Sequence, residues 1–275
     1  MEPIRVVVRR GGVVEATHRV HAAATSGEHH GDPSLVAFLR SSLKPIQAVP
    51  LVEGWDDLAD DEIAIACASH QAEPAQLDAV RKLLARAGAG PDELENGEQE
   101  GRPDGRLGHN CSGKHAGMLA ACRAHGWPAH PYRDPDHPLQ RRVAELVGAV
   151  DGLGVDGCGV PTFAMPLARM AEVFARVPPR IAAAMRARPE LVGGRGADDT
   201  DLMRALPGWT AKRGAEGLLC ALSPDGVGWA LKVEDGASRA LRPALGALLG
   251  IDAFREVPVE NSLGETVGSI GSEPA

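Results

Sequence analysis

The chain has 275 residues, of which 44% are hydrophobic and 24% are charged, a composition typical of a folded globular protein. Its net charge is -8 and its pI is near 5.7. These values argue against binding to nucleic acid or to a membrane surface, because both need an excess of Lys and Arg. We therefore expect a small-molecule substrate, no nucleic-acid partner and no membrane partner.

The first ten residues carry charges at positions 2, 5, 9 and 10, so we expect no signal peptide. Nowhere do about eighteen apolar residues run together, so we expect no transmembrane helix. The five cysteines are odd in number and widely spread, which is typical of free thiols in a reducing compartment. We therefore expect a cytoplasmic protein.

The sequence predicts strands towards both ends of the chain and helices between them. Residues 4–8 and 13–24 are rich in β-branched side chains and predict a hairpin that turns at Gly11 and Gly12. Apolar periodicity then predicts helices over 74–88, 113–125, 137–149, 166–187 and 199–206. Strand patterns return in TAKRGA, GLLCALS and GVGWALKVE, and a last helix is predicted over 238–249. We expect loops over 89–109 and 188–198, and a weakly structured tail over 257–275.

Strands, a helical insert, further strands and a closing helix predict an α+β fold rather than alternating βαβ units. We expect one domain over 1–275, with a central, mainly antiparallel sheet flanked by helices. The sheet lobe is expected over about 1–40 and 207–256, and the helical lobe over about 41–206.

The use of basic residues singles out the lysines, because the chain has twenty-four Arg and only five Lys. Only Lys can lose its proton to act as a base or a metal ligand, since guanidinium stays protonated in proteins. Lys82 lies in an amphipathic helical pattern and is expected at the surface. The other four, for which a surface ion pair is the alternative, are candidates for chemistry: Lys44, Lys114, Lys212 and Lys232.

The stretch GHNCSGKHAGML, residues 108–119, is close to a phosphate-binding loop but has His115 where that loop needs Ser or Thr. No buried strand leads into it, because the preceding residues are polar and rich in Gly and Pro. We therefore reject the nucleotide interpretation, and the role of Cys111 and Lys114 stays open at this point.

The stretch LRSSLKPIQAVPLVE contains an S-x-x-K pattern. Pro45 is tolerated only in the first turn of a helix, so a helix is predicted to begin near Ser41 or Ser42. Ser41 and Lys44 then share a face, whereas Ser42 and Lys44 do not. In serine acyl-transfer enzymes such a lysine takes the proton of the serine. The alternative is a helix-capping serine beside an exposed lysine.

Two other segments support the catalytic interpretation. IACASHQAEP offers Ser69 as a second serine, and TAKRGA places Lys212 before Gly214 on a late strand. A nucleophile on an early helix, a helical insert, a K-x-G strand and a closing helix form the layout of penicillin-binding proteins and serine β-lactamases. We therefore predict that fold.

Seven segments in this order resemble the bacterial asparaginase II family, which has a serine β-lactamase and glutaminase-like fold. They are RGGVVEATHRVHAA, RSSLKPIQA, CASHQAEP, NCSGKHAGMLAACR, DPDHPLQ, DGCGVPTFAMPLARMA and LKVEDG. The resemblance spans most of the chain and implies hydrolysis of the side-chain amide of L-asparagine to aspartate and ammonia, usually by a homodimer. The stretch between Leu94 and Asn110 is shorter than in the family and the C-terminus is abbreviated, which leaves the rim of the site and the dimer contact open.

The resemblance also implies roles for particular residues. The family's S-x-x-K serine and lysine fall on Ser41 and Lys44, its second serine on Ser69, and the lysine paired with that serine on Lys212. In zinc-containing members the ligands fall on Cys111, Lys114 and Cys158, which implies about one zinc ion per chain. Thiolates and a neutral amine suit Zn²⁺. The alternative is that both cysteines are small buried apolar residues.

The resulting hypothesis is a serine acyl-enzyme in which Lys44 deprotonates Ser41, while Ser69 and Lys212 relay a proton to the leaving amine. Arg40, His115 and Asp156 are candidates for binding the substrate's α-carboxylate and α-amino groups, because they adjoin the motifs. Two other functions remain open. One is a zinc hydrolase that uses metal-bound hydroxide, and the other is a non-catalytic amide-binding or penicillin-binding protein.

Overall fold

The structure is a computed structural model that describes residues 1–273. The chain forms two compact units, each of which we describe by itself. Unit 1 comprises Met1–Ala37, Pro166–Ala175 and the chain from Arg213 onward, and unit 2 comprises Phe38–Met165 and Arg176–Lys212. The short strand β4 (Val36–Phe38) lies where the chain first passes from unit 1 to unit 2.

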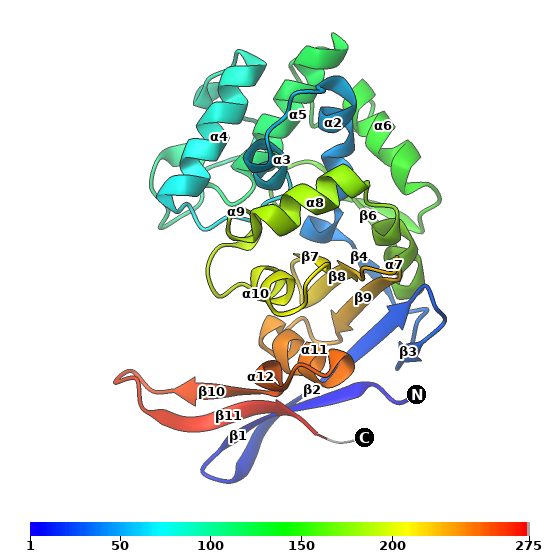
Figure 1. The fold of residues 1–275 in the computed structure, drawn as a ribbon, viewed down its shortest axis with the longest axis vertical. Helices are drawn as coiled ribbons and strands as arrows, with labels where there is room; N and C mark the ends of the chain where they lie inside the picture. The colour runs from blue at the N-terminus through cyan, green and yellow to red at the C-terminus, as the bar shows by residue number, and fades with distance from the viewer. Residues whose placement is uncertain (274–275) are drawn as a thin grey trace. The chain divides into compact units, whose positions relative to one another are not determined.

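Unit 1 is built on an antiparallel sheet (Figure 1). Its neighbouring strands follow the order β10-β11-β1-β2-β9-β8, and β3 pairs with β2. The strands are β1 (Ile4–Arg10), β2 (Val13–Ala24), β3 (His29–His30), β8 (Leu218–Leu222), β9 (Gly228–Val233), β10 (Glu256–Glu260) and β11 (Thr266–Ser272). Helices α7 (Leu167–Ala175), α11 (Leu241–Leu249) and α12 (Asp252–Arg255) complete the unit. The predicted hairpin is confirmed, with Gly11 and Gly12 both at positive φ.

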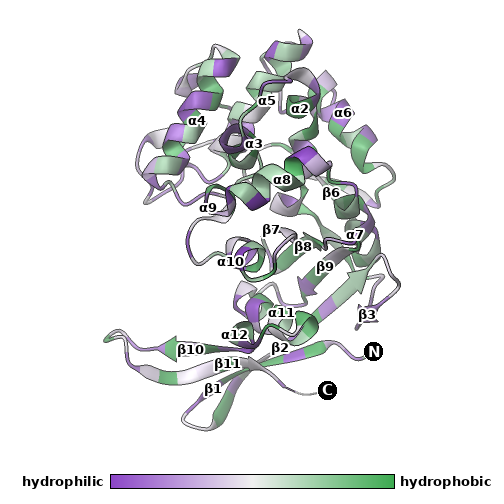
Figure 2. Ribbon diagram, in the orientation of Figure 1, coloured by the Kyte–Doolittle hydropathy of each residue, from purple (hydrophilic) through white to green (hydrophobic). Residues whose placement is uncertain are grey.

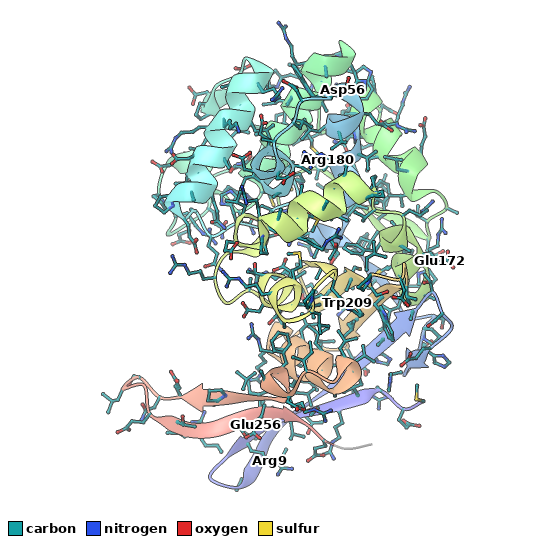
Figure 3. All side chains as sticks on the ribbon, viewed as in Figure 1. Arg9, Asp56, Glu172, Arg180, Trp209 and Glu256 are labelled. Atoms are coloured by element: carbon teal, nitrogen blue, oxygen red, sulfur yellow. The ribbon has the colours of Figure 1, made fainter. Side chains whose placement is uncertain are left out.

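The predicted weakly structured tail is wrong over residues 257–273, which contain most of β10 and all of β11, and its last two residues lie outside the described range. Ile270 of β11 is buried and pairs with Val8 of β1. A methyl group added at Gly268 would lie 2.1 Å from the carbonyl oxygen of Arg9, so glycine permits this close pairing. Arg9, labelled in Figure 3, also forms an ion pair with Glu273.

Unit 2 is mainly helical. It contains α1 (Lys44–Gln47), α2 (Val49–Gly54), α3 (Asp60–Ala66), α4 (Pro74–Ala87), α5 (Ser112–His125), α6 (Pro138–Val147), α8 (Pro179–Ala187), α9 (Pro189–Gly193) and α10 (Asp198–Ala205). Strands β5 (Gly152–Val155) and β6 (Pro161–Pro166) pair antiparallel, and β7 (Thr210–Arg213) follows α10. The helix predicted over 166–187 is instead two helices, α7 and α8, because Pro178 and Pro179 interrupt it. The loop predicted over 188–198 contains α9.

Helix α3 is the buried centre of unit 2 and contacts α4, α5 and α8 (Figure 1). Residues Ile63, Ala64 and Ile65 are completely buried. A methyl group added at Gly113 of α5 would lie 2.2 Å from the carbonyl oxygen of Ile65, so the backbones of α3 and α5 touch at this point. Burial of apolar surface stabilises this packing. Along α4, apolar residues alternate with hydrophilic residues (Figure 2).

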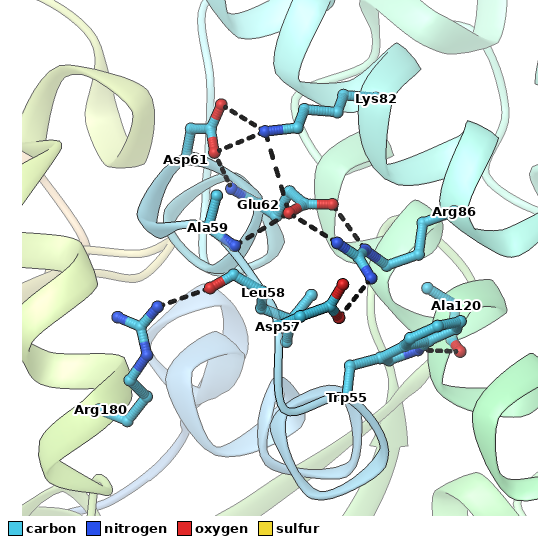
Figure 4. A network of polar contacts seen from close by, with 10 residues as sticks. All are labelled: Trp55, Asp57, Leu58, Ala59, Asp61, Glu62, Lys82, Arg86, Ala120 and Arg180. Carbon is cyan, nitrogen blue, oxygen red and sulfur yellow. Dashed lines mark hydrogen bonds and ion pairs between the residues drawn. The ribbon is translucent and has the colours of Figure 1, made fainter.

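A buried carboxylate links α3 to α4 (Figure 4). Glu62 is only 2% exposed, and its Oε2 accepts a hydrogen bond from the backbone N–H of Ala59 at 2.9 Å. Arg86 Nε donates to Glu62 Oε1 at 2.7 Å, and the same guanidinium lies 4.9 Å from the ring centroid of Trp55. The charge of Glu62 is therefore compensated by a partner from the next helix.

The structure confirms the predicted α+β fold with an antiparallel sheet, flanking helices and a separate concentration of helices. Within residues 1–273, no helix is both long and apolar enough to cross a membrane.

Candidate functional site

Buried polar side chains are concentrated in unit 2, since all but His18, His21 and Ser223 lie there. They include Lys44, Lys114 and Lys212, each at most 2% exposed, whereas Lys82 is exposed as predicted. Burying a lysine is unfavourable unless it has partners, so these three lysines indicate where the functional site lies. A cavity of about 770 Å³ lies in unit 1, but none of its lining residues belongs to this group, and we place the site by its chemistry.

The S-x-x-K segment forms a 3₁₀ turn, Arg40–Leu43, and the α-helix begins only at Lys44. This corrects the predicted helix start, although Pro45 does lie in the first turn. In a 3₁₀ helix residues three apart eclipse each other, and the N–H of Lys44 donates to the carbonyl oxygen of Ser41. Ser41 and Lys44 therefore still share a side, and Ser41 is half-buried.

Ser42 has a structural contact instead. It is completely buried, and its hydroxyl donates to the carbonyl oxygen of Lys212 at 2.9 Å. Arg40, at the start of the turn, has a φ of 47°, a left-handed conformation that is strained for a residue with a side chain. Strain beside a candidate nucleophile is common at functional sites.

Lys44 connects this turn to the segment after α3. Its Nζ donates to the carbonyl oxygen of Ala68 at 2.5 Å and to Ser69 Oγ at 3.0 Å. The backbone N–H of Ser69 donates to the carbonyl oxygen of Val192 at 2.8 Å, which fixes the segment. The structure thus brings together Lys44 and Ser69, two of the four predicted catalytic residues.

Lys212 forms a buried ion pair that sequence analysis missed. Its Nζ donates to Asp199 Oδ2 at 2.7 Å, and both side chains are completely buried. Asp199 lies in the first turn of α10 within the run ADDTD, which resembles a solvated helix start. Asp199 therefore gives the Lys212 ammonium a counter-ion, and the expected pairing of Lys212 with Ser69 stays a prediction.

Cys111, Lys114 and Cys158 lie close together. Lys114 Nζ donates to Cys158 Sγ at 2.8 Å. A hydrogen bond from Cys158, opposed by burial and aided by the positive charges of Lys44 and Lys114, holds the pKa of Cys111 well below its usual value. The same hydrogen bond, together with burial, raises the pKa of Cys158. Cys111 is therefore the first of the two cysteines to become a thiolate. The positive charge of Lys44, a catalytic candidate, helps to stabilise that thiolate.

These donors suit Zn²⁺ in chemistry, since thiolates and an amine are ligands that it accepts. Among the residues that the structure describes, no group of three or more His, Cys, Asp or Glu side chains is arranged to hold a metal ion. A zinc centre here would therefore depend on Lys114 as a ligand. Next to the cluster, the Nε2 atom of His115 is buried without a hydrogen-bond partner in residues 1–273, as if a group were missing from its surroundings.

The three predicted substrate-binding residues fall into two places. Arg40 Nε donates to Asp156 Oδ1 at 2.6 Å. Burial works against the charged form of Asp156, but Lys114 and Arg40 outweigh it and lower the pKa of that carboxyl. His115 has a different partner: it is completely buried, and its Nδ1 lies 2.8 Å from the hydroxyl of Tyr132.

His109 is a further residue that sequence analysis did not single out. It is half-buried, and its Nδ1 accepts a hydrogen bond from the backbone N–H of Cys111 at 3.0 Å. Burial lowers the pKa of His109, with Cys158 opposing and Lys44 adding to the effect. Its place inside the GHNCSGKH stretch was the available signal.

Comparisons with curated proteins and with solved structures give only weak likenesses. No curated protein matches the sequence at a significant level. Among solved structures, a "putative beta-lactamase" from Bacteroides dorei DSM 17855 is 13% identical, with 84% of each chain covered and a TM-score of 0.41. "Mglu in its native form" is 12% identical, with 84% of this chain and 64% of that chain covered and a TM-score of 0.36. No argument rests on likenesses this low.

The family comparison covers nearly the whole chain. The family model described as L-asparaginase II matches residues 6–270, a range that contains every candidate site residue named above. The chain therefore belongs to the L-asparaginase II family.

Proposed function

We propose that the protein hydrolyses the side-chain amide of L-asparagine to L-aspartate and ammonia through an acyl-enzyme on Ser41. Membership of the L-asparaginase II family supports an amide hydrolase acting on a small molecule. The observation that carries the serine mechanism is Lys44, a buried amine one 3₁₀ turn from Ser41 and 3.0 Å from Ser69 Oγ. A nucleophile next to a base that is itself oriented by a third group is the usual arrangement of covalent catalysis.

In the first half-reaction, Ser41 Oγ attacks the amide carbon and gives its proton to Lys44, which must enter this step as a neutral amine. The carbon–nitrogen bond then breaks, and the leaving nitrogen takes a proton from Lys44 through Ser69 and departs as ammonia. In the second half-reaction, water attacks the ester, gives a proton back along the same path and releases L-aspartate. Lys212, with Asp199 as its counter-ion, would supply fixed positive charge.

Substrate orientation is assigned to a pair of opposite charges. An amino acid carries an α-carboxylate and an α-amino group, so its site needs one cation and one anion. Arg40 and Asp156 provide both, and their side chains are 29% and 10% exposed. We propose that these two residues hold the α groups of the substrate.

Zinc is assigned to Cys111, Lys114 and Cys158. When bound, it would supply a positive charge beside the lysines and orient the groups around it. The residues themselves already form a compact set, with the amine of Lys114 2.8 Å from Cys158 Sγ. We also propose a cytoplasmic location, in line with five cysteines that are all buried free thiols. The homodimer that we propose rests on the family resemblance. Light scattering coupled to size-exclusion chromatography tests the dimer.

The test of the serine mechanism compares two adjacent serines. Ser41→Ala should lose nearly all release of ammonia from L-asparagine. Ser42→Ala should keep most of the turnover and lose about 1 kcal/mol of stability, because it removes one buried hydrogen bond. L-Glutamine, measured in parallel, decides substrate preference. Activity that survives in Ser41→Ala, in protein shown to be folded, would exclude Ser41 as the nucleophile.

The test of the zinc assignment uses Lys114→Arg. A guanidinium keeps the charge but has no free lone pair, so this variant should lose zinc as completely as Cys111→Ser or Cys158→Ser. Elemental analysis of purified protein reads the result. Full zinc occupancy in Lys114→Arg would make Lys114 a binding cation instead of a ligand. Complete loss of turnover on chelation, with Ser41→Ala still active, would favour a zinc hydrolase.

A further inference from the structure

A chain of hydrogen bonds leads from the backbone of Glu95 to the imidazole of His115. The N–H of Glu95 donates to the hydroxyl oxygen of Tyr132 at 2.7 Å, and that hydroxyl lies 2.8 Å from His115 Nδ1. Tyr132 and His115 are both completely buried. Water therefore does not compete for these groups, and the direction of each proton is decided by the protein.

The direction can be worked out from the number of donors. The Tyr132 hydroxyl has one proton to donate, and within residues 1–273 the acceptor in contact with it is His115 Nδ1. If Nδ1 carried a proton instead, the oxygen would receive two N–H groups and its own buried proton would have no acceptor. Nδ1 therefore holds a lone pair, and the neutral ring carries its proton on Nε2.

This places an N–H group beside the cysteine cluster. The buried Nε2 atom has no formed hydrogen bond in the described residues, a state that is rare and costly for a buried donor. Burial lowers the pKa of His115 to about 4, Cys158 opposes this effect and Lys114 adds to it, so both side chains lie beside the ring. Cys158 Sγ already accepts a hydrogen bond from the Lys114 ammonium at 2.8 Å, and we take this sulfur as the candidate acceptor for the Nε2–H group.

We propose that His115 is a positioning residue: its Nε2–H donates to Cys158 Sγ, and Tyr132 fixes the tautomer that makes this possible. This inference rests on the proposed zinc site, for which Cys158 would be a ligand. An N–H group aimed at a thiolate orients that ligand and stabilises its negative charge. In this proposal His115 does not bind the substrate, although its position in the sequence first suggested that role.

The rival arrangement makes His115 Nε2 a fourth zinc ligand. A ligating nitrogen needs a lone pair, so Nε2 would have to lose its proton and Nδ1 would have to donate to Tyr132. The Tyr132 hydroxyl proton would then be buried without an acceptor. The two arrangements therefore differ in one observable, the tautomer of His115.

Nitrogen-15 NMR of histidine-labelled, metal-free protein reads the tautomer directly, with His115→Gln used to assign the signal among the ten histidines. We expect a pyrrole-like Nε2 and a pyridine-like Nδ1, and we expect Tyr132→Phe to lose this preference. The same tautomer should persist in protein loaded with cadmium-113, without coupling between the metal and Nε2. A pyridine-like Nε2, or a metal coupling to it, would overturn the proposal.

Zinc affinity gives a second readout. Removing the N–H with His115→Leu should weaken zinc binding by about 10-fold to 100-fold, the usual effect of losing a group that supports a ligand. His115→Gln, whose amide N–H can reach a similar position, should recover part of this loss. Equal affinity in all three proteins would overturn the proposal. If wild-type protein binds no zinc, the zinc assignment fails, whereas the tautomer still decides whether His115 donates.

Discussion

The buried ion pair between Lys212 and Asp199 allows the sharpest prediction about stability. Nζ and Oδ2 are 2.7 Å apart, and neither side chain is exposed. Asp199→Asn keeps the size of the side chain but removes the negative charge that lies 2.7 Å from the Lys212 ammonium. Removing one partner of such a pair costs about 3 to 5 kcal/mol. For 275 residues the entropy of unfolding is about 0.6 kcal/mol/K, so a loss of about 4 kcal/mol lowers Tm by roughly 7 °C.

Calorimetry and urea unfolding of three variants measure this effect. Lys212→Met should also destabilise, because it removes the positive charge beside the buried carboxylate of Asp199. The double variant Asp199→Asn with Lys212→Met should be more stable than the sum of the single changes predicts, since both charges of the pair are then gone. A fall in Tm of less than about 2 °C in Asp199→Asn, or strictly additive losses, would refute the reasoning.

Two further predictions concern the buried side chains of His70 and Glu62. Burial, with the charges of Lys44 and Arg102, lowers the pKa of His70 to about 3. Between its unfolded value near 6.5 and about 3, only the unfolded chain binds the proton. The free energy of unfolding should therefore fall by up to about 1.4 kcal/mol per pH unit on acidification. When this free energy is measured by urea unfolding from pH 4.5 to 8, it should depend less on pH in His70→Gln than in the wild type. Glu62→Gln should lower the free energy of unfolding by about 2 kcal/mol, because it weakens the hydrogen bonds from Arg86. Ammonia release should stay near the wild-type rate, and a large loss of turnover would instead link Glu62 to the site.

Local patterns predicted the elements whose cause is local. Helix α4 follows the predicted range because its apolar positions recur at helical spacing, and a glycine at positive φ follows both α4 and α5. The register of Ser41 against Lys44 was predicted correctly from Pro45, although the turn is a 3₁₀ helix. The helical pattern around Lys82 correctly placed that lysine at the surface. Of the four lysines singled out as candidates, three are buried and Lys232 is only half-buried.

Features that depend on distant partners could not be predicted in this way. Strand β11 contains glycines where a strand pattern needs side chains, and its stability comes from pairing with β1 at the other end of the chain. Asp199 is indistinguishable in sequence from its acidic neighbours, and only the fold brings it to Lys212. Cys158 likewise lies far along the chain from Lys114, so the cysteine cluster came from the family resemblance and not from spacing.

The contact of α5 with α3 at Gly113 has a consequence for any attempt to redesign this enzyme. Helix α5 carries Lys114 immediately after Gly113, and α3 leads directly into Ser69. Because a methyl group at position 113 would lie 2.2 Å from the carbonyl oxygen of Ile65, even Gly113→Ala must push the two helices apart. Lys114, the proposed metal ligand, and Ser69, the proposed proton relay, would then shift together, so a change at this helix contact would affect both proposed roles. Libraries aimed at new amide substrates should leave residue 113 fixed and vary positions on the rim.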